Sequence, residues 1–171
     1  EAYSLRADAY STIGNKEKAE SDVQKALTLE PNNQVLFLKQ ARVLLATGKY
    51  VDAAALFSKV IQLNPSSSDA YVGRGLASSR LNKNEAALVD FDKAISIDGK
   101  LTESYLYKSE IFENEKKYDE AIAEVGRAIE ARADDSSLYV RRAMLNQVAM
   151  RKEAVWPDLD RALKINPRDA K

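Results

Sequence analysis

The sequence of 171 residues contains neither cysteine nor histidine. Without thiols and imidazoles it can form no disulfide, no cysteine nucleophile, no histidine general base and none of the common zinc sites. Only carboxylate, lysine, tyrosine or serine chemistry would remain for a reaction. We therefore predict that the protein is not an enzyme and that it uses no cofactor and no metal.

The sequence also lacks a net charge, because 26 lysines and arginines balance 26 aspartates and glutamates. Nucleic acids and anionic membranes attract an excess of positive charge, so we expect no nucleic-acid partner. No stretch approaches the roughly 18 consecutive apolar residues of a transmembrane helix, and we expect no membrane insertion. The hydrophobic content of 45% is nevertheless ample for a core.

What the sequence does contain is a repeat, because shifting it by 34 residues superimposes it on itself without an insertion. Although only 8% of the residues are aromatic, one position of the repeat is aromatic in all five copies: Tyr3, Phe37, Tyr71, Tyr105 and Tyr139. Four positions later every residue is small: Ala7, Ala41, Gly75, Ser109 and Ala143. A ring one helical turn from a small residue is typical of two helices in close contact.

A second helix follows in each copy, predicted from an apolar stripe with helical spacing. Its small position holds Ala19, Ala53, Ala87, Ala121 and Val155, and its bulky position holds Val23, Phe57, Phe91, Val125 and Leu159. A short turn separates the two helices, at Gly14, Gly48, Asn82, Lys116 and Met150. Glycine suits this place because it accepts a positive φ. Each period is thus a helix, a turn, a second helix and a second turn.

The fifth copy contains Trp156 and Pro157 where the other copies continue into the second helix. Proline is tolerated in the first turn of a helix and costs about 3 kcal/mol in its interior. We therefore predict that the second helix of this repeat starts late, near Ala154, or bends at this point. We expect Trp156 to pack at the edge of the repeat, with a binding anchor as the alternative.

In this pattern the sequence resembles the tetratricopeptide repeat family over essentially its whole length. The first copy occupies the signature positions with Tyr3, Ala7, Tyr10, Gly14, Ala19, Val23, Ala26 and Pro31. The resemblance implies an all-α fold, a right-handed superhelical α-solenoid of antiparallel helix-turn-helix repeats. We expect a single array with repeats at 1–33, 34–67, 68–101, 102–135 and 136–169.

The chain opens at Glu1 without a methionine or a signal-peptide pattern, so we expect it to be a piece of a longer protein. The compartment stays open: the cytoplasm is favoured, and a cell envelope or a lumen is not excluded.

The resemblance also implies a concave groove, lined by the first helix of each repeat, that binds an extended peptide or a helix of a partner protein. Transferring the lining positions gives a candidate groove of Leu38, Arg42, Leu45, Val72, Leu76, Arg80, Leu106, Glu110, Glu113, Val140, Met144 and Val148. We predict that the partner places apolar side chains over repeats 2, 3 and 5, an acidic group near the arginines and a basic group near the glutamates. The alternative is that the superhelix or a flanking helix covers these apolar side chains.

Three other functions compete with this prediction. The first is self-association through exposed ends of the array, which would give a homo-oligomer. The second is an enzyme using Glu103, Glu110, Glu113 and Tyr107, for which a solvated helix face is the better interpretation. The third is RNA binding by a related helical repeat, but such repeats are nearer 35 residues long and carry a basic inner surface. A protein or peptide of unknown identity remains the expected partner.

Overall fold

The structure is a computed structural model that describes residues 1–167, and in this range it consists of ten α-helices without a strand. Their bounds are α1 Ala2–Thr12, α2 Lys16–Leu29, α3 Gln34–Ala46, α4 Tyr50–Leu63, α5 Ser68–Arg80, α6 Asn84–Ile97, α7 Thr102–Asn114, α8 Tyr118–Ala131, α9 Ser136–Val148 and α10 Lys152–Ile165. We call the odd-numbered helices A helices and the even-numbered ones B helices. The predicted all-α repeat architecture is confirmed.

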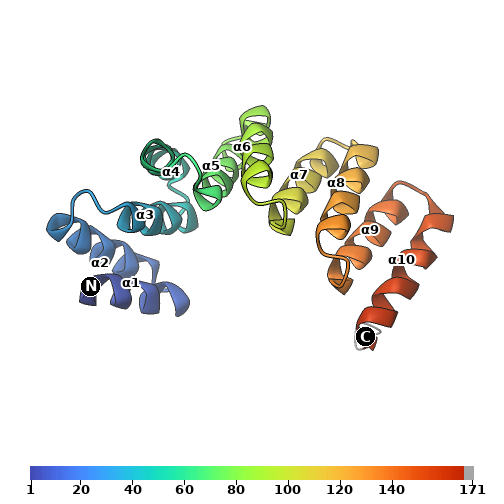
Figure 1. Cartoon of the computed structure of the whole chain (residues 1–171), viewed down its shortest axis with the longest axis horizontal. Coiled ribbons are helices and arrows are strands. Elements are labelled where there is room, and N and C mark those ends of the chain that lie inside the picture. The colour runs from blue at the N-terminus through green and yellow to red at the C-terminus, as the bar shows by residue number, and fades with distance from the viewer. Residues whose placement is uncertain (168–171) are drawn as a thin grey trace. The chain divides into compact units, whose positions relative to one another are not determined.

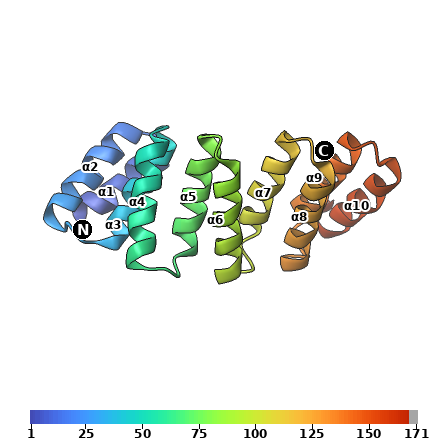
Figure 2. The ribbon, with the colours of Figure 1, turned by 90° about the horizontal axis from the view of Figure 1, so that it is seen from above.

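The chain forms two compact units, Glu1–Lys93 and Ala94–Lys171. In each unit, helices that follow one another in sequence pack together: α1 through α5 in the first unit, and α7 through α10 in the second (Figures 1 and 2). In the first unit α3 also contacts α5, so these two A helices are neighbours. Packing of each hairpin on the next is the arrangement of a repeat solenoid. The right-handed superhelix stays a prediction.

The small and bulky positions of the repeat form the cores of both units. Ala53 and Phe57 of α4 are 0% exposed in the first unit, as are Ala121 and Val125 of α8 in the second. The small A-helix position is buried in all five repeats, which lets the B-helix side chains approach the A-helix backbone. Among the glycines, the closest approach is at Gly73 of α5, where an added Cβ would lie 2.2 Å from Cζ of Phe57.

The turn between the A and B helices has the same backbone conformation in every repeat. The middle one of its three residues has a positive φ throughout: Gly14 (75°), Gly48 (81°), Asn82 (59°), Lys116 (59°) and Met150 (60°). This left-handed conformation is favourable for glycine and strained for a residue with a side chain. The repeat thus imposes the turn geometry even where the sequence lacks its preferred residue.

The predicted late start of the last B helix is wrong. Helix α10 begins at Lys152, the repeat position at which α8 begins with Tyr118, and continues through Pro157. The turn fixes this start, because Arg151 N–H donates to the carbonyl of Asn146 at 2.8 Å. The carbonyl that Pro157 leaves without its helical donor belongs to the exposed Glu153, where water can replace the donor. A bend at this proline stays a prediction.

Trp156 does not pack at the edge of its repeat, since 68% of it is exposed. The same repeat position holds Ala54 in the first unit and Ile122 in the second, and both of these pack against the core of their unit.

Candidate functional site

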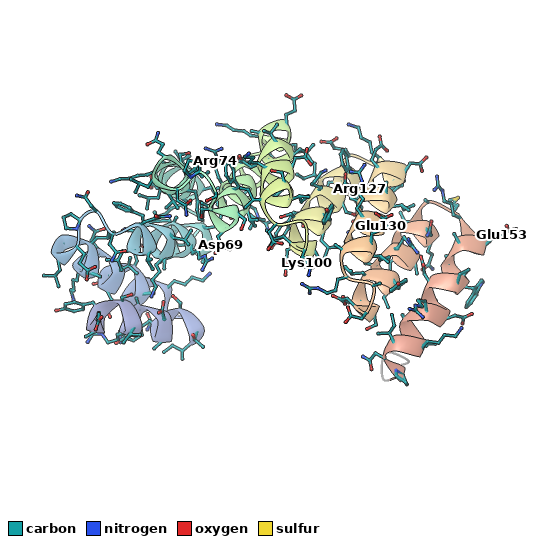
Figure 3. All side chains as sticks on the ribbon, in the orientation of Figure 1. Asp69, Arg74, Lys100, Arg127, Glu130 and Glu153 are labelled. Atoms are coloured by element: carbon teal, nitrogen blue, oxygen red, sulfur yellow. The ribbon has the colours of Figure 1, made fainter. Side chains whose placement is uncertain are left out.

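The orientation of three A helices is fixed by a bidentate ion pair to the B helix of the same repeat. In each case an arginine donates through Nε and Nη2 to both oxygens of an aspartate 16 residues later. The pairs are Arg6–Asp22 (2.6 and 2.8 Å), Arg74–Asp90 (2.8 and 2.7 Å) and Arg142–Asp158 (2.9 and 2.6 Å). The aspartates are buried while the arginines remain partly exposed, and the planar guanidinium fixes both distance and angle. Arg74 is labelled in Figure 3.

The other two repeats vary this contact. In repeat 4, Lys108 Nζ lies 2.9 Å from Glu124 Oε1, and both side chains are 7% exposed. In repeat 2 the basic position is Gln40 and the acidic position is Leu56, so neither charge is present. Sequence reasoning missed these pairs, although the two positions could have been found by comparing the repeats for charges that change together.

The hydrogen bonds donated by Arg6 lower the pKa of Asp22, against the opposing effect of burial. The corresponding bonds to aspartate raise the pKa of Arg74 and of Arg142. Arg6 and Asp22 are therefore both charged at neutral pH, and an ionic contact holds α1 to α2 there.

The first unit has a pocket of about 380 Å³ between α1 and α3. It is lined by Ala7, Asp8, Ser11, Thr12, Lys16, Val23, Lys39, Arg42, Val43 and Ala46. Of the candidate groove residues in this unit, Arg42 lines the pocket and is exposed. Leu38 and Leu45 are partly buried against the core, and Val72 and Leu76 of α5 are half-buried. The apolar candidates in this unit thus present only part of their surface to solvent.

Two positive side chains of α3, Lys39 and Arg42, already have partners within the chain. Lys39 Nζ lies 2.7 Å from Ser4 Oγ and 2.6 Å from Asp8 Oδ2. Arg42 Nη2 donates to Asp69 Oδ2 at 2.8 Å, and Asp69 is labelled at the start of α5 in Figure 3. Arg80 is exposed and makes no ion pair within residues 1–167. An acidic partner group at Arg42 would therefore compete with Asp69.

The second unit has a pocket of about 320 Å³ between α7 and α9. It is lined by Leu106, Tyr107, Glu110, Ser137, Leu138 and Arg141. Glu110 is exposed, and the half-buried Glu113 pairs with Arg141. Two of the candidate groove residues, Leu106 and Glu110, thus line one pocket, and a third, Glu113, contacts its rim.

The apolar candidates on α9 differ in exposure. Val140 is partly buried against the core of the second unit. Met144 and Val148 follow at intervals of one helical turn and are 54% and 51% exposed. Such side chains gain most from being covered by another apolar surface.

Neither membrane nor metal sites emerge from the described part of the chain. No helix there is long and apolar enough to cross a bilayer. The described residues also contain no group of three or more aspartates and glutamates placed to hold a metal ion.

Comparison with known proteins identifies the repeat. Tetratricopeptide repeat models match residues 1–33, 38–100 and 102–135. The DnaJ homolog subfamily C member 7 homolog of Schizosaccharomyces pombe is 32% identical over 155 residues, which cover 81% of this chain and 32% of that protein. This chain therefore spans about a third of the length of that relative.

Solved structures share the fold at low sequence identity. The crystal structure of MamA matches with a TM-score of 0.79 and 21% identity, covering 96% of both chains. The structure of YrrB, described as a tetratricopeptide repeat protein with an unusual peptide-binding site, matches with a TM-score of 0.66 and 21% identity, covering 96% of this chain and 85% of YrrB. The chain belongs to the tetratricopeptide repeat family, whose helical arrays are scaffolds for protein interaction.

Proposed function

We propose that the protein holds an extended peptide or a helix of a partner protein against its A helices. The observation that carries this proposal is that a pocket lies between consecutive A helices in each unit, α1 and α3 in the first and α7 and α9 in the second. Residues of two A helices line each pocket, so a bound chain could contact both of these helices within its unit.

The chemistry of the A helices supports a peptide as the ligand. Partly exposed apolar side chains such as Leu76 and Met144 alternate with charged ones such as Arg80 and Glu110. Covering apolar surface contributes about 25 cal/mol per Å², and the charges select among segments that could provide it. A peptide or an amphipathic helix supplies both kinds of group along one line.

We further propose that binding occurs without catalysis. The chain has no histidine or cysteine, and Glu103 and Glu110 are exposed. Two carboxylates act as an acid and a base when burial gives them different proton affinities, and these two lack that environment.

A phage-displayed library of random peptides tests the proposal. Peptides that bind the second unit of the intact chain should lose binding to the Val148→Lys variant, which places a positive charge on the A-helix surface. The Val89→Lys variant is the matched control, because Val89 is an equally helical and 67% exposed valine on a B helix. Circular dichroism verifies that both variants fold. If no peptide is selected, the proposal is wrong, and if the two variants bind all selected peptides equally well, the A helices of the second unit are not the binding surface.

Self-association is the second candidate, and the exposure of Trp156 favours it. This ring occupies a repeat position that is partly buried at Ala54 and Ile122. A second copy could cover it with its N-terminal repeat, which is acidic, whereas the fifth repeat is basic. Light scattering at two protein concentrations should then show a mass that rises with concentration, and the Trp156→Lys variant should abolish the rise. A constant mass contradicts this candidate.

A further inference from the structure

One face of α7 carries three carboxylates around a leucine. Glu103, Leu106, Glu110 and Glu113 are spaced by three and four residues, which places them on the same side of a helix. Glu113 is neutralised by Arg141. Glu103 and Glu110 are exposed and form no ion pair in the described part of the chain. Two carboxylates on this face are therefore free to meet a cation from outside the chain.

The neighbouring face of α9 is apolar. Val140, Met144 and Val148 are spaced by four residues, and the last two are about half exposed. Between the two helices lies the pocket of about 320 Å³, with Leu106 and the buried Leu138 in its lining and Glu110 beside them. The surface thus combines an apolar row on α9, an acidic row on α7 and a pocket between them.

We propose that this face of the second unit binds a cationic amphipathic segment of a partner protein, with apolar side chains over α9 and the pocket and with lysines or arginines over Glu103 and Glu110. The inference rests on the proposed function and adds the chemistry of the partner. The pocket and α9 require apolar side chains, because a purely polar segment would leave Met144 and Val148 uncovered.

The unpaired carboxylates determine the sign of the partner's charge. An acidic segment would bring like charges together beside an apolar surface, where water screens them less. Nucleic acids and anionic lipid head groups are disfavoured for the same reason. The first unit differs, since Lys39 and Arg42 are paired with Asp8 and Asp69 and its unpaired candidate groove charge, Arg80, is a cation. A cationic segment is therefore better matched to the second unit than to the first.

Fluorescence anisotropy with two labelled synthetic peptides tests the proposal. One is an amphipathic helix of leucine and lysine, and the other has glutamate in place of each lysine. The intact chain should bind the lysine peptide at least tenfold more tightly, and added salt should reduce the difference. The double variant Glu103→Gln and Glu110→Gln should weaken binding of the lysine peptide by roughly five- to twentyfold, since an exposed charge pair contributes a few-fold each.

The matched control is Glu130→Gln, the same change at an exposed glutamate of the B helix α8, labelled in Figure 3. It should leave binding of the lysine peptide within a factor of two. Equal affinity for the two peptides, or equal weakening by Glu130→Gln and by the double variant, overturns the proposal. Peptides from the random library separate this failure from that of the proposed function. If they bind the A helices but are acidic or neutral, the charge assignment is wrong and the binding surface stands.

Discussion

Replacing Gly73 by alanine tests how closely consecutive repeats pack. Gly73 lies inside α5, where alanine is intrinsically better than glycine by about 1 kcal/mol. Its backbone, however, is in contact with the ring of Phe57 from α4. A Cβ atom at this position would lie 2.2 Å from Cζ and 2.3 Å from Cε1 of that ring. The same substitution that stabilises an exposed helix should therefore destabilise this one.

The size of the effect follows from the overlap. Carbon atoms in contact are separated by about 3.5–4.0 Å, so the ring or the helix must move by more than about 1 Å. Phe57 is 0% exposed, so its ring can move only within the packed core. Overpacking of a core costs about 1–3 kcal/mol, and this overlap belongs at the upper end. After the gain in helix propensity, we expect the free energy of unfolding to fall by about 2 kcal/mol.

Gly126→Ala is the matched control. Gly126 also lies inside a helix, α8, but an added Cβ there would meet only Arg142 Nη1, at the ordinary contact distance of 3.8 Å. This variant should raise the free energy of unfolding by up to about 1 kcal/mol. Urea unfolding followed by circular dichroism measures both variants, and the two should have opposite signs.

A double-mutant cycle with Phe57→Leu assigns the cause. The smaller side chain leaves space that the new methyl group can occupy, so Gly73→Ala should cost much less in the Phe57→Leu background. Two results would contradict this reasoning: Gly73→Ala stabilises the protein as Gly126→Ala does, or the free-energy changes of the two substitutions at 57 and 73 simply add. In either case the close contact of α4 with α5 does not limit the size of the side chain at position 73.

Three further predictions concern the turn, the ion pairs and the aromatic position. Lys116→Gly should raise the free energy of unfolding by about 0.5–1 kcal/mol, because it relieves a strained positive φ. Gly48→Ala should lower the free energy of unfolding by about 1 kcal/mol, because it introduces the same strain. Urea unfolding measures both variants. Asp22→Asn should destabilise the protein near neutral pH, and the difference should vanish in acid. Arg6 lowers the pKa of Asp22, so the stabilisation by this ion pair is fully present above the unfolded pKa near 4 and is lost as the pH falls through the lower folded value. Urea titrations over this pH range measure the difference in the free energy of unfolding between the variant and the intact chain. A difference that does not depend on pH contradicts the prediction. Tyr139→Phe should cost about 0.5–1.5 kcal/mol in thermal or urea unfolding, since its hydroxyl donates to the carbonyl of Ala133 at 3.1 Å.

The helices and turns could be predicted from the sequence because they depend on residues close together in the chain. The repeat position shared by Gly48 and Lys116 was predicted as a turn, and both residues have a positive φ there. The start of α10 could not be predicted from Pro157 alone. The hydrogen bond from Arg151 fixes the start of that helix, and the backbone tolerates the proline where water can reach the freed carbonyl.

The partners of charged side chains could be predicted less well. The candidate groove residues Arg42 and Glu113 were chosen as charges for a partner to meet, but Asp69 and Arg141 of the next A helix neutralise them. These contacts join residues 27 and 28 positions apart. That separation belongs to the stacking of one hairpin on the next, and the spacing within a helix gives no information about it. Whether the candidate groove residues bind a partner remains a prediction.

Repeat 2 shows which residues can replace the ion pair between the two helices of a repeat. Arginine or lysine faces aspartate or glutamate in the other four repeats, whereas Gln40 and Leu56 replace both members here. Gln40 donates instead to Gln24 of the preceding B helix at 2.9 Å, and Leu56 packs against the core. Losing one member alone would leave a buried charge without a partner, which is strongly unfavourable, whereas replacing both by neutral groups is tolerated. The repeat therefore accepts either an ion pair between its two helices or neutral residues at both positions.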